Sequence, residues 1–105
     1  MPAYLIVNVD VKNGEKLKDY MKATPAIIKQ FDGKFLVRGG DFEICEGNWH
    51  PQRLVVVEFE SMQMAKQFYN SPEYQAIIGL RQSSAYTDFV FVDGLSVEMS
   101  NVLNN

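Results

Sequence analysis

Two kinds of apolar periodicity alternate along this chain of 105 residues, and their order limits what it can fold into. Four segments are short, apolar and rich in β-branched residues, which is typical of strands. Within the first and the last connection between them, apolar residues recur every three or four positions, which predicts helices that bury one face. The order β-α-β-β-α-β is the ferredoxin-like arrangement, an α+β fold in which a four-stranded antiparallel sheet carries both helices on one face. The predicted strands are residues 3–11, 34–38, 53–59 and 86–93, and helical spacing runs from Leu17 to Phe31 and from Met64 to Arg81.

Helix caps and breakers divide these segments. Asn13 offers a cap for the first helix, and Asp32-Gly33 ends it. Pro25 falls inside the first helical pattern, so we expect it to kink that helix or split it in two. The run 70–72 breaks the second helical segment, because Ser71 is a good cap and Pro72 suits the first position of a new helix.

The second strand leads into a glycine pair, Gly39-Gly40, which permits a sharp bend or a bulge. We expect residues 41–46 to continue the strand beyond this bend. Residues 47–51 then form a turn before the next strand.

The strands are apolar on both faces, although helices cover only one face of the predicted sheet. In the third strand, Val55 and Val57 share one face, while Leu54 and Val56 share the opposite one. The first and last strands repeat this pattern. An open apolar face of this size exceeds what monomers tolerate, so the sequence predicts a homodimer in which two sheets stack face to face.

Three polar residues share strand parity with the outer, helix-free face: Asn8, Arg38 and Glu58. A buried arginine and a buried glutamate are costly unless they pair or stay hydrated. Either Arg38 and Glu58 form an ion pair, or the three residues line a cavity between the sheet and its partner. In the second case Arg38 would bind a carboxylate or enolate through its planar guanidinium, and Glu58 would act as a general base.

Other side chains have a structural and a functional interpretation. The hydroxyls of Tyr69 and Tyr74 could reach a pocket from the helix side, although core packing explains both residues as well. Trp49 would pack over a sheet end or the dimer seam, or else stack on a ligand. We expect Arg81 to complement the dipole of its helix and Cys45 to be a small buried hydrophobe.

Composition argues against several classes of partner. The net charge is −3 and the pI about 5.0, with no basic cluster, which disfavours nucleic acid and anionic membranes. The basic and aromatic strand motif of RNA-binding sheets is also missing. No signal peptide is evident and Cys45 has no second cysteine to pair with, so we expect a cytoplasmic protein. With His50 as the one histidine and no nucleotide motif, no metal or other cofactor is predicted.

Four stretches and one arginine carry a resemblance to a known family: Gly33–Gly40, Glu46–Trp49, Arg53–Phe59, Phe68–Gln75 and Arg81. Together they resemble the domain of unknown function 1330 family of small bacterial proteins, within the ferredoxin-like dimeric alpha-beta barrel superfamily. The resemblance implies a dimer with a pocket beside the sheet, and it implies no established reaction. Superfamily relatives include small monooxygenases, lactone isomerases and haem-degrading enzymes, which is an analogy of fold.

The resemblance covers residues 3–94. The family typically has two glycines where this chain has Asp32-Gly33. We therefore expect one domain over residues 1–94, followed by a short tail, residues 95–105, that frays or docks through its apolar side chains.

Two functions remain open on the sequence. The first is a small-molecule pocket for an organic acid or an aromatic compound in a homodimer, with cofactor-independent chemistry possible there. The second is a non-catalytic dimer that binds a metabolite or assists another protein, which the lack of a clear nucleophile or base favours.

Overall fold

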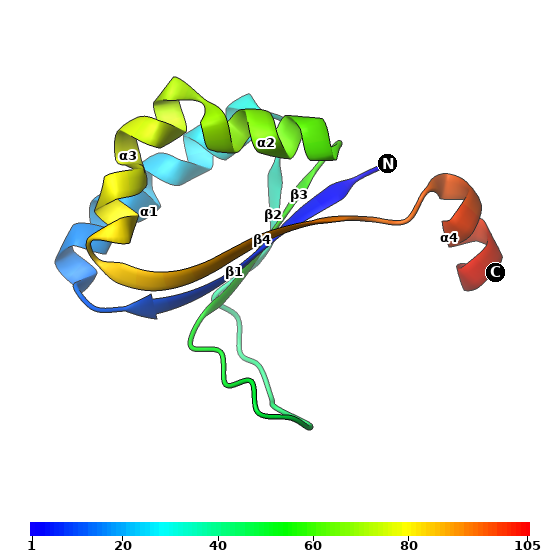
Figure 1. The fold of residues 1–105 in the computed structure, drawn as a ribbon, viewed down its shortest axis with the longest axis horizontal. Coiled ribbons are helices and arrows are strands. Elements are labelled where there is room, and N and C mark those ends of the chain that lie inside the picture. Colours follow the sequence, from blue (N-terminus) through cyan, green and yellow to red (C-terminus); the bar gives the residue numbers. More distant parts are fainter.

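A computed structural model describes residues 1–105, and it confirms the α+β, ferredoxin-like prediction. One antiparallel sheet has the strand order β2-β3-β1-β4, and α1, α2 and α3 all lie on the same face of it (Figure 1). The second helical segment is two helices, because Ser71 ends one and caps the next. The elements are β1 (Ala3–Val11), α1 (Gly14–Gln30), β2 (Lys34–Arg38), β3 (Leu54–Phe59), α2 (Met62–Asn70), α3 (Pro72–Gln82), β4 (Ala85–Asp93) and α4 (Val97–Asn104).

The core lies between the sheet and the three helices. Alternate residues of β1 are buried, as the strand period requires, and Leu5 pairs across the sheet with Val57 and Phe91. Side chains of the opposite parity face away from the helices, and Val90 keeps 54% of its surface exposed. The prediction that the strands are apolar on both faces is therefore confirmed.

A β-bulge in β2 overturns the predicted orientation of Arg38. Phe35 pairs with Val57, but Val37 pairs with the adjacent Val56, so Leu36 is an extra residue in the ladder. An extra residue inverts the side-chain alternation that follows it. Arg38 consequently pairs with Val55 and faces the helices. Strand parity without the bulge had placed it on the outer face.

Helix α1 is not split at Pro25, contrary to one of the two outcomes expected there. Its beginning matches the prediction, because the Asn13 side chain accepts a hydrogen bond from the backbone N–H of Lys16. At its end, Asp32 has a φ of 58°, a conformation that glycine adopts more easily. A glycine in that position would fit without strain.

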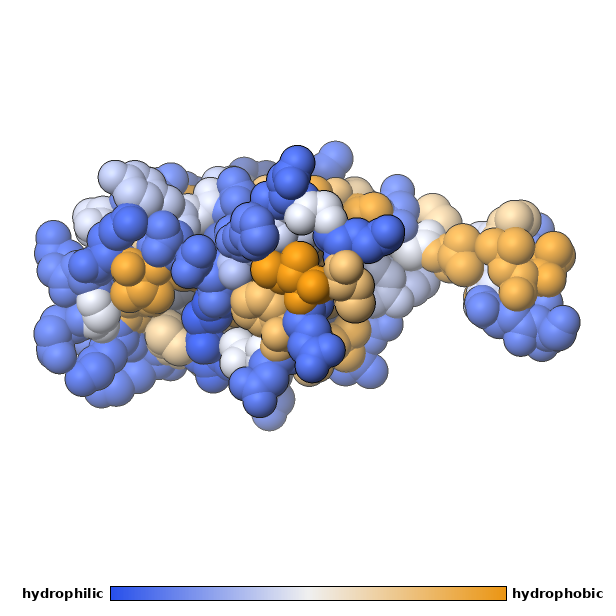
Figure 2. Space-filling view, turned by 90° about the horizontal axis from the view of Figure 1, so that it is seen from below, coloured by the Kyte–Doolittle hydropathy of each residue, from blue (hydrophilic) through white to orange (hydrophobic).

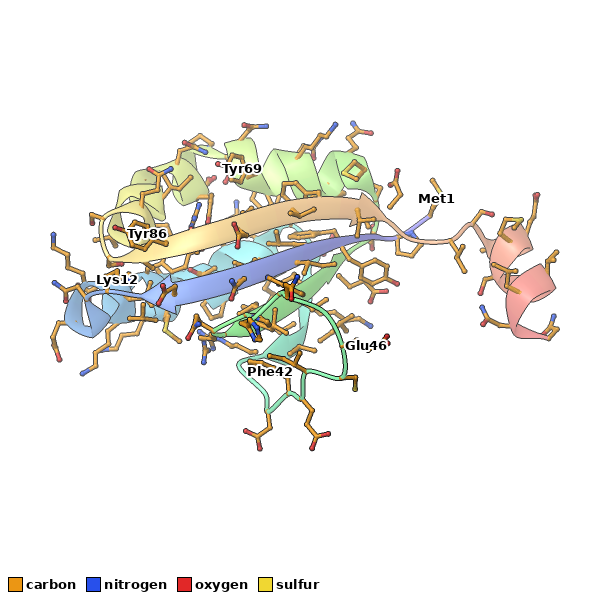
Figure 3. All side chains as sticks on the ribbon, turned by 60° about the horizontal axis from the view of Figure 1, so that its bottom comes forward. Met1, Lys12, Phe42, Glu46, Tyr69 and Tyr86 are labelled. Atoms are coloured by element: carbon orange, nitrogen blue, oxygen red, sulfur yellow. The ribbon has the colours of Figure 1, made fainter.

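Two predictions for residues 39–50 are wrong. Residues 41–46 do not extend a strand, and residues 39–50 form an exposed loop that leaves the body beyond β2 (Figures 1 and 3). Cys45 lies on this loop and is exposed, so it is not a core residue. The C-terminal tail, residues 95–105, contains α4, which stands away from the rest of the chain.

Candidate functional site

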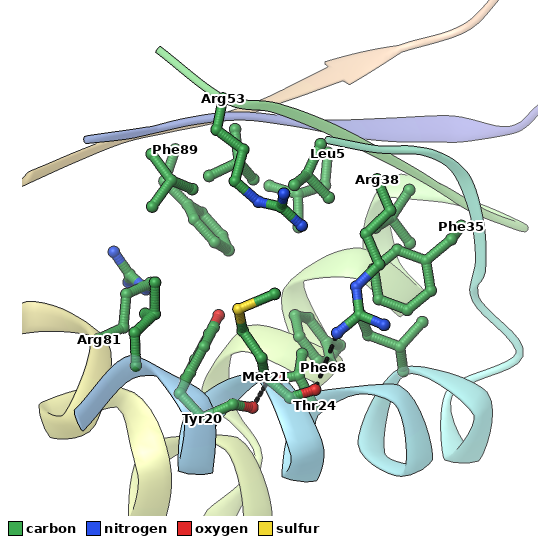
Figure 4. Close-up of a pocket in the computed structure, with 16 residues that line it drawn as sticks. Leu5, Tyr20, Met21, Thr24, Phe35, Arg38, Arg53, Phe68, Arg81 and Phe89 are labelled. Carbon is green, nitrogen blue, oxygen red and sulfur yellow. Dashed lines mark hydrogen bonds between the residues drawn. The ribbon is translucent and has the colours of Figure 1, made fainter. Parts of the chain in front are cut away.

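A cavity lies on the helix side of the sheet, between the strands and α1 (Figure 4). Its volume is about 60 Å³. By a comparable measure one water molecule needs about 10–15 Å³, so the space suits roughly four to six water molecules or a ligand of similar size. Twelve of the sixteen lining residues are hydrophobic, and the other four are Thr24, Arg38, Arg53 and Arg81. This is a different space from the cavity predicted on the outer face, between the sheet and a partner, which stays a prediction.

All three arginines of the chain line this one cavity, and none of its lysines does. No aspartate, glutamate or histidine is among the lining residues, and no arginine forms an ion pair with a carboxylate. The three differ in depth: Arg38 is exposed, Arg53 is half-buried and Arg81 is buried. A positively charged, mostly apolar space results, and its charge is not balanced by the protein.

Arg38 is held at the cavity by a hydrogen bond to α1, at a carbonyl that Pro25 leaves without a helical partner. Pro25 has no N–H, so the carbonyl of Met21, four residues earlier, has no helical donor. The Arg38 Nη2 donates to that carbonyl at 2.8 Å. The guanidinium also lies over the ring of Phe35, 5.0 Å from its centroid. Pro25 therefore creates an acceptor for Arg38 on the cavity side of α1.

Arg53 reaches the cavity over a glycine. Gly39 has a φ of +71°, and its amide donates to the Leu54 carbonyl at 2.8 Å as the last bond between the two chain segments. A Cβ at this position would collide with the Arg53 guanidinium. The Arg53 side chain has no hydrogen-bond acceptor within the protein, so its fork of donors is available to a ligand.

Arg81 lies in the last turn of α3, the position expected of a complement to the helix dipole, and it also forms the deep, helix-side wall of the cavity. Only 5% of its surface is exposed, and its Nε donates to the hydroxyl of Tyr74 at 3.2 Å. A second donor bonds to the hydroxyl of Thr87, and the guanidinium lies over the ring of Phe89. Tyr74 is bonded in turn to the Tyr20 hydroxyl, with 2.7 Å between the two oxygens.

Five of the six predicted site residues are not among those that line the cavity. Asn8 holds the end of the loop in place, because its side-chain oxygen accepts from the amides of Gln52 and Arg53. Glu58 faces outward and pairs with Lys34 at 3.2 Å, so the predicted ion pair with Arg38 does not form.

The other three of these residues are aromatic. Trp49 is 58% exposed on the loop. Tyr69 lies on α2 (Figure 3). Its ring packs against Phe89 and Phe91 on the sheet. Tyr74 is fully buried and reaches the cavity only through Tyr20 and Arg81. Of the predicted ligand-binding residues, Arg38 alone lines the cavity.

Sequence reasoning missed Arg53 and Tyr20. A signal for Arg53 was present, since it shares strand parity with Val55 and Val57, whose side chains were expected to pack together in the core. The position of Tyr20 was less visible, because one tyrosine on an apolar helix face is ordinary core composition. Its neighbour Tyr74 comes from a different helix, so only the fold brings the two hydroxyls together.

The chain has no group of three or more His, Cys, Asp or Glu side chains arranged to hold a metal ion. His50 and Cys45 lie on the exposed loop, outside the cavity. None of the helices has both the length and the apolar character needed to cross a bilayer.

Comparison with solved structures supports the fold. A protein of unknown function from Rhodopseudomonas palustris, RPA0582, superposes with a TM-score of 0.75 at 15% identity, covering 90% of this chain and 83% of that one. A dimeric ferredoxin-like protein of unknown function from Jannaschia sp. CCS1 has a TM-score of 0.67 at 10% identity, covering 90% and 100%. SnoaB, a cofactor-independent oxygenase from Streptomyces nogalater, has a TM-score of 0.62 at 8% identity, covering 91% and 95%.

Identities this low establish similarity of fold alone. No curated protein is similar enough in sequence to count as a relative. A family model, however, matches residues 2–95, which include every strand and all three helices that cover the sheet. The chain belongs to the domain of unknown function 1330 (DUF1330) family.

Proposed function

We propose that this protein is a homodimer that binds a small organic acid in the cavity between its sheet and α1. The observation that carries the proposal is the gathering of all three arginines around a mostly apolar space that contains no carboxylate. A buried cation is stable when an anion balances it, and Arg81 has no anionic partner within the protein. A ligand carboxylate would supply the missing charge.

The shape and chemistry of the walls define the ligand further. Arginine presents several N–H donors in one plane, which matches the two oxygens of a carboxylate better than lysine does. Leu5, Met21 and Phe89 provide an apolar surface beside the guanidinium groups. The volume of about 60 Å³ suits a compound of about the size of butyrate. The ligand class is therefore a short acid with an apolar body.

The dimer rests on a second set of observations. Figure 2 shows the molecule from the side away from the helices, where apolar side chains gather near the middle of the body and on α4. Ile6, Val90 and Val92 are exposed there, as is Leu36 at the bulge. Dimerisation would remove this surface from water, and similar folds are described as dimeric.

Cofactor-independent catalysis is the second candidate function, favoured by the similarity of fold to an oxygenase described in those terms. The cavity offers the hydroxyls of Tyr20 and Thr24 but no carboxylate or imidazole that could act as a general base. Glu58, the predicted base, lies on the other face of the sheet. Binding is therefore proposed ahead of catalysis.

Calorimetric titration with butyrate and with butyramide tests the proposal. Butyramide has the same shape but no charge, so butyrate should bind at least about tenfold more tightly if guanidinium groups recognise the ligand. The variant Arg53→Met should abolish this preference, and it should fold normally because the Arg53 side chain has no acceptor to lose.

A matched control is Lys66→Met, which removes one positive charge from an exposed site on α2, outside the cavity. This variant should bind butyrate as the unmodified protein does. Equal affinity for butyrate and butyramide, or butyrate binding that survives Arg53→Met, would contradict the proposed site.

A further inference from the structure

Two tyrosines and an arginine form a continuous hydrogen-bonded chain that ends at the cavity. Arg81 Nε donates to the Tyr74 hydroxyl oxygen at 3.2 Å, and the hydroxyl oxygens of Tyr74 and Tyr20 are 2.7 Å apart. Tyr20 lines the cavity, whereas Tyr74 does not. Arg81 and Tyr74 come from α3 and Tyr20 from α1, so packing between these two helices holds the chain together.

The direction of these hydrogen bonds follows from what each group can donate. Arginine has no acceptor, so Tyr74 must receive the Arg81 bond through its oxygen. The proton of the buried Tyr74 hydroxyl then has one acceptor in reach, the oxygen of Tyr20. Burial raises the pKa of Tyr74 well above its usual range, so this proton is retained at any physiological pH.

Tyr20 is left with a free proton as a consequence. Its oxygen is occupied by Tyr74, and its own O–H has no acceptor within the protein. In Figure 4 the Tyr20 ring rises from α1 between Arg81 and Met21, with its hydroxyl toward the cavity. The deep part of the cavity therefore presents a single oriented, neutral donor in addition to the guanidinium groups.

We propose that the Tyr20 hydroxyl donates to a second oxygen of the ligand, that Tyr74 and Arg81 are positioning residues for it, and that the ligand is an oxo acid. The proposal rests on the proposed function, because it concerns the same cavity. An alkyl acid that filled the space would leave the Tyr20 O–H without an acceptor, which is unfavourable. A carbonyl oxygen beside the apolar part of the acid would accept that proton.

Calorimetric titrations with two matched pairs of acids test this inference: butyrate against 2-oxobutyrate, and pentanoate against 4-oxopentanoate. The two pairs place the carbonyl at different distances from the carboxylate. In at least one pair the oxo acid should bind about fivefold to tenfold more tightly, which is the usual effect of satisfying one buried hydrogen bond. Tyr20→Phe should remove that preference and leave the affinity for the alkyl acid unchanged or improved.

The positioning role has its own measurement. Tyr74→Phe should lower the ratio of the two affinities to a value between those of the unmodified protein and Tyr20→Phe, because the Tyr20 hydroxyl is then free to turn. A merely structural role for Tyr74 would weaken both acids equally and leave the ratio intact. Tyr69→Phe is the matched control, since Tyr69 packs against the sheet outside the cavity and should leave the ratio unchanged.

The outcomes separate this inference from the proposed function. If the acids bind in a way that depends on Arg53 but neither pair shows a preference for the oxo acid, the inference is overturned and the proposed function stands. A preference that persists in Tyr20→Phe also overturns the inference. If none of the four acids binds, both fall together.

Discussion

Among single residues, the contact between Arg38 and the Met21 carbonyl says most about how the cavity is built. A proline inside a helix normally leaves an unsatisfied carbonyl and destabilises the helix. Here the orphaned carbonyl lies where a strand delivers a guanidinium to it at 2.8 Å. Pro25 and Arg38 therefore depend on one another, and the pair connects α1 to β2 at the cavity mouth.

This dependence predicts a coupling between two substitutions. Arg38→Met should cost about 1 kcal/mol of unfolding free energy, because the Met21 carbonyl loses its donor. In a Pro25→Ala background the amide of residue 25 supplies that donor, so the same change should cost close to nothing. Urea unfolding of the two single variants and the double variant measures the coupling. Equal costs of Arg38→Met in the two backgrounds would contradict this account.

Burial of Tyr74 predicts a specific loss of stability at alkaline pH. The pKa of Tyr74 is raised above its ordinary value of 10.0, chiefly by burial and then by neighbouring Tyr20. The unfolded chain therefore releases this proton near pH 10 while the folded chain keeps it, so the stabilisation is complete below about pH 10 and declines as the pH rises further.

The variant Tyr74→Phe lacks this titration, which makes it the comparison of choice. Between about pH 9 and pH 11, roughly the range in which a free tyrosine titrates, its unfolding free energy should fall less steeply than that of the unmodified protein. The variant Tyr69→Phe should follow the unmodified protein. Parallel curves for all three proteins would show that burial of the Tyr74 hydroxyl does not perturb its pKa.

At the scale of elements, periodicity predicts which segments are strands and helices, and local irregularity decides where the functional groups point. Residues 3–11 and 34–38 are strands with the predicted bounds, and in the first of them buried residues alternate as a strand requires. The bulge at Leu36 has no clear signal in five apolar and basic residues, yet it moves Arg38 from one face to the other. The sequence therefore singled out an arginine that does line the cavity, but it placed that arginine on the wrong face of the sheet.

The loop was mispredicted and the helix α4 was not predicted, for related reasons. Residues 41–46 have the composition of a strand, but beyond Gly39 the chain turns away from β3 and finds no strand to pair with. In α4 the Ser96 side chain caps the first turn, and the helix leaves its apolar side chains exposed, with Val97 at 74%. Both segments present apolar groups that the isolated chain does not cover.

Deleting residues 95–105 tests whether α4 belongs to the proposed dimer interface. The strands and the other helices keep all their contacts with one another, so the truncated chain should lose the circular dichroism contribution of α4 alone and keep that of the remaining strands and helices. Its dimer should dissociate at a protein concentration at least about tenfold higher than that of the full chain, because apolar contacts are lost. An unchanged dissociation constant by analytical ultracentrifugation would separate α4 from the interface.

At the scale of the whole molecule, the exposed apolar side chains are not scattered. The outer face of the sheet, the loop and the C-terminal segment hold almost all of them, while the far side of the helices is polar. Monomeric proteins rarely concentrate their exposed apolar surface in this way. A dimer that stacked the two outer faces would be expected to bury about 1,600 Å² in total.

Val56→Asp should therefore convert the dimer to a monomer and lower its melting temperature, because it places a charge at the centre of the outer face. The matched control is Gln67→Asp, which adds the same charge at an exposed position on α2. Multi-angle light scattering measures the mass of each variant. A protein that is monomeric at micromolar concentration before any substitution, or a Val56→Asp variant that remains dimeric, would mean that this face is not the interface.

The central claim, that the cavity beside α1 is where a small acid binds, is tested most directly by methyl NMR of the methionines. The chain has five methionines, and Met21 alone lines the cavity. Titrating butyrate into protein labelled at its methionine methyl groups should shift the Met21 resonance saturably and leave those of Met1 and Met99, which are exposed, in place. Saturation that leaves the Met21 methyl unmoved would contradict the account.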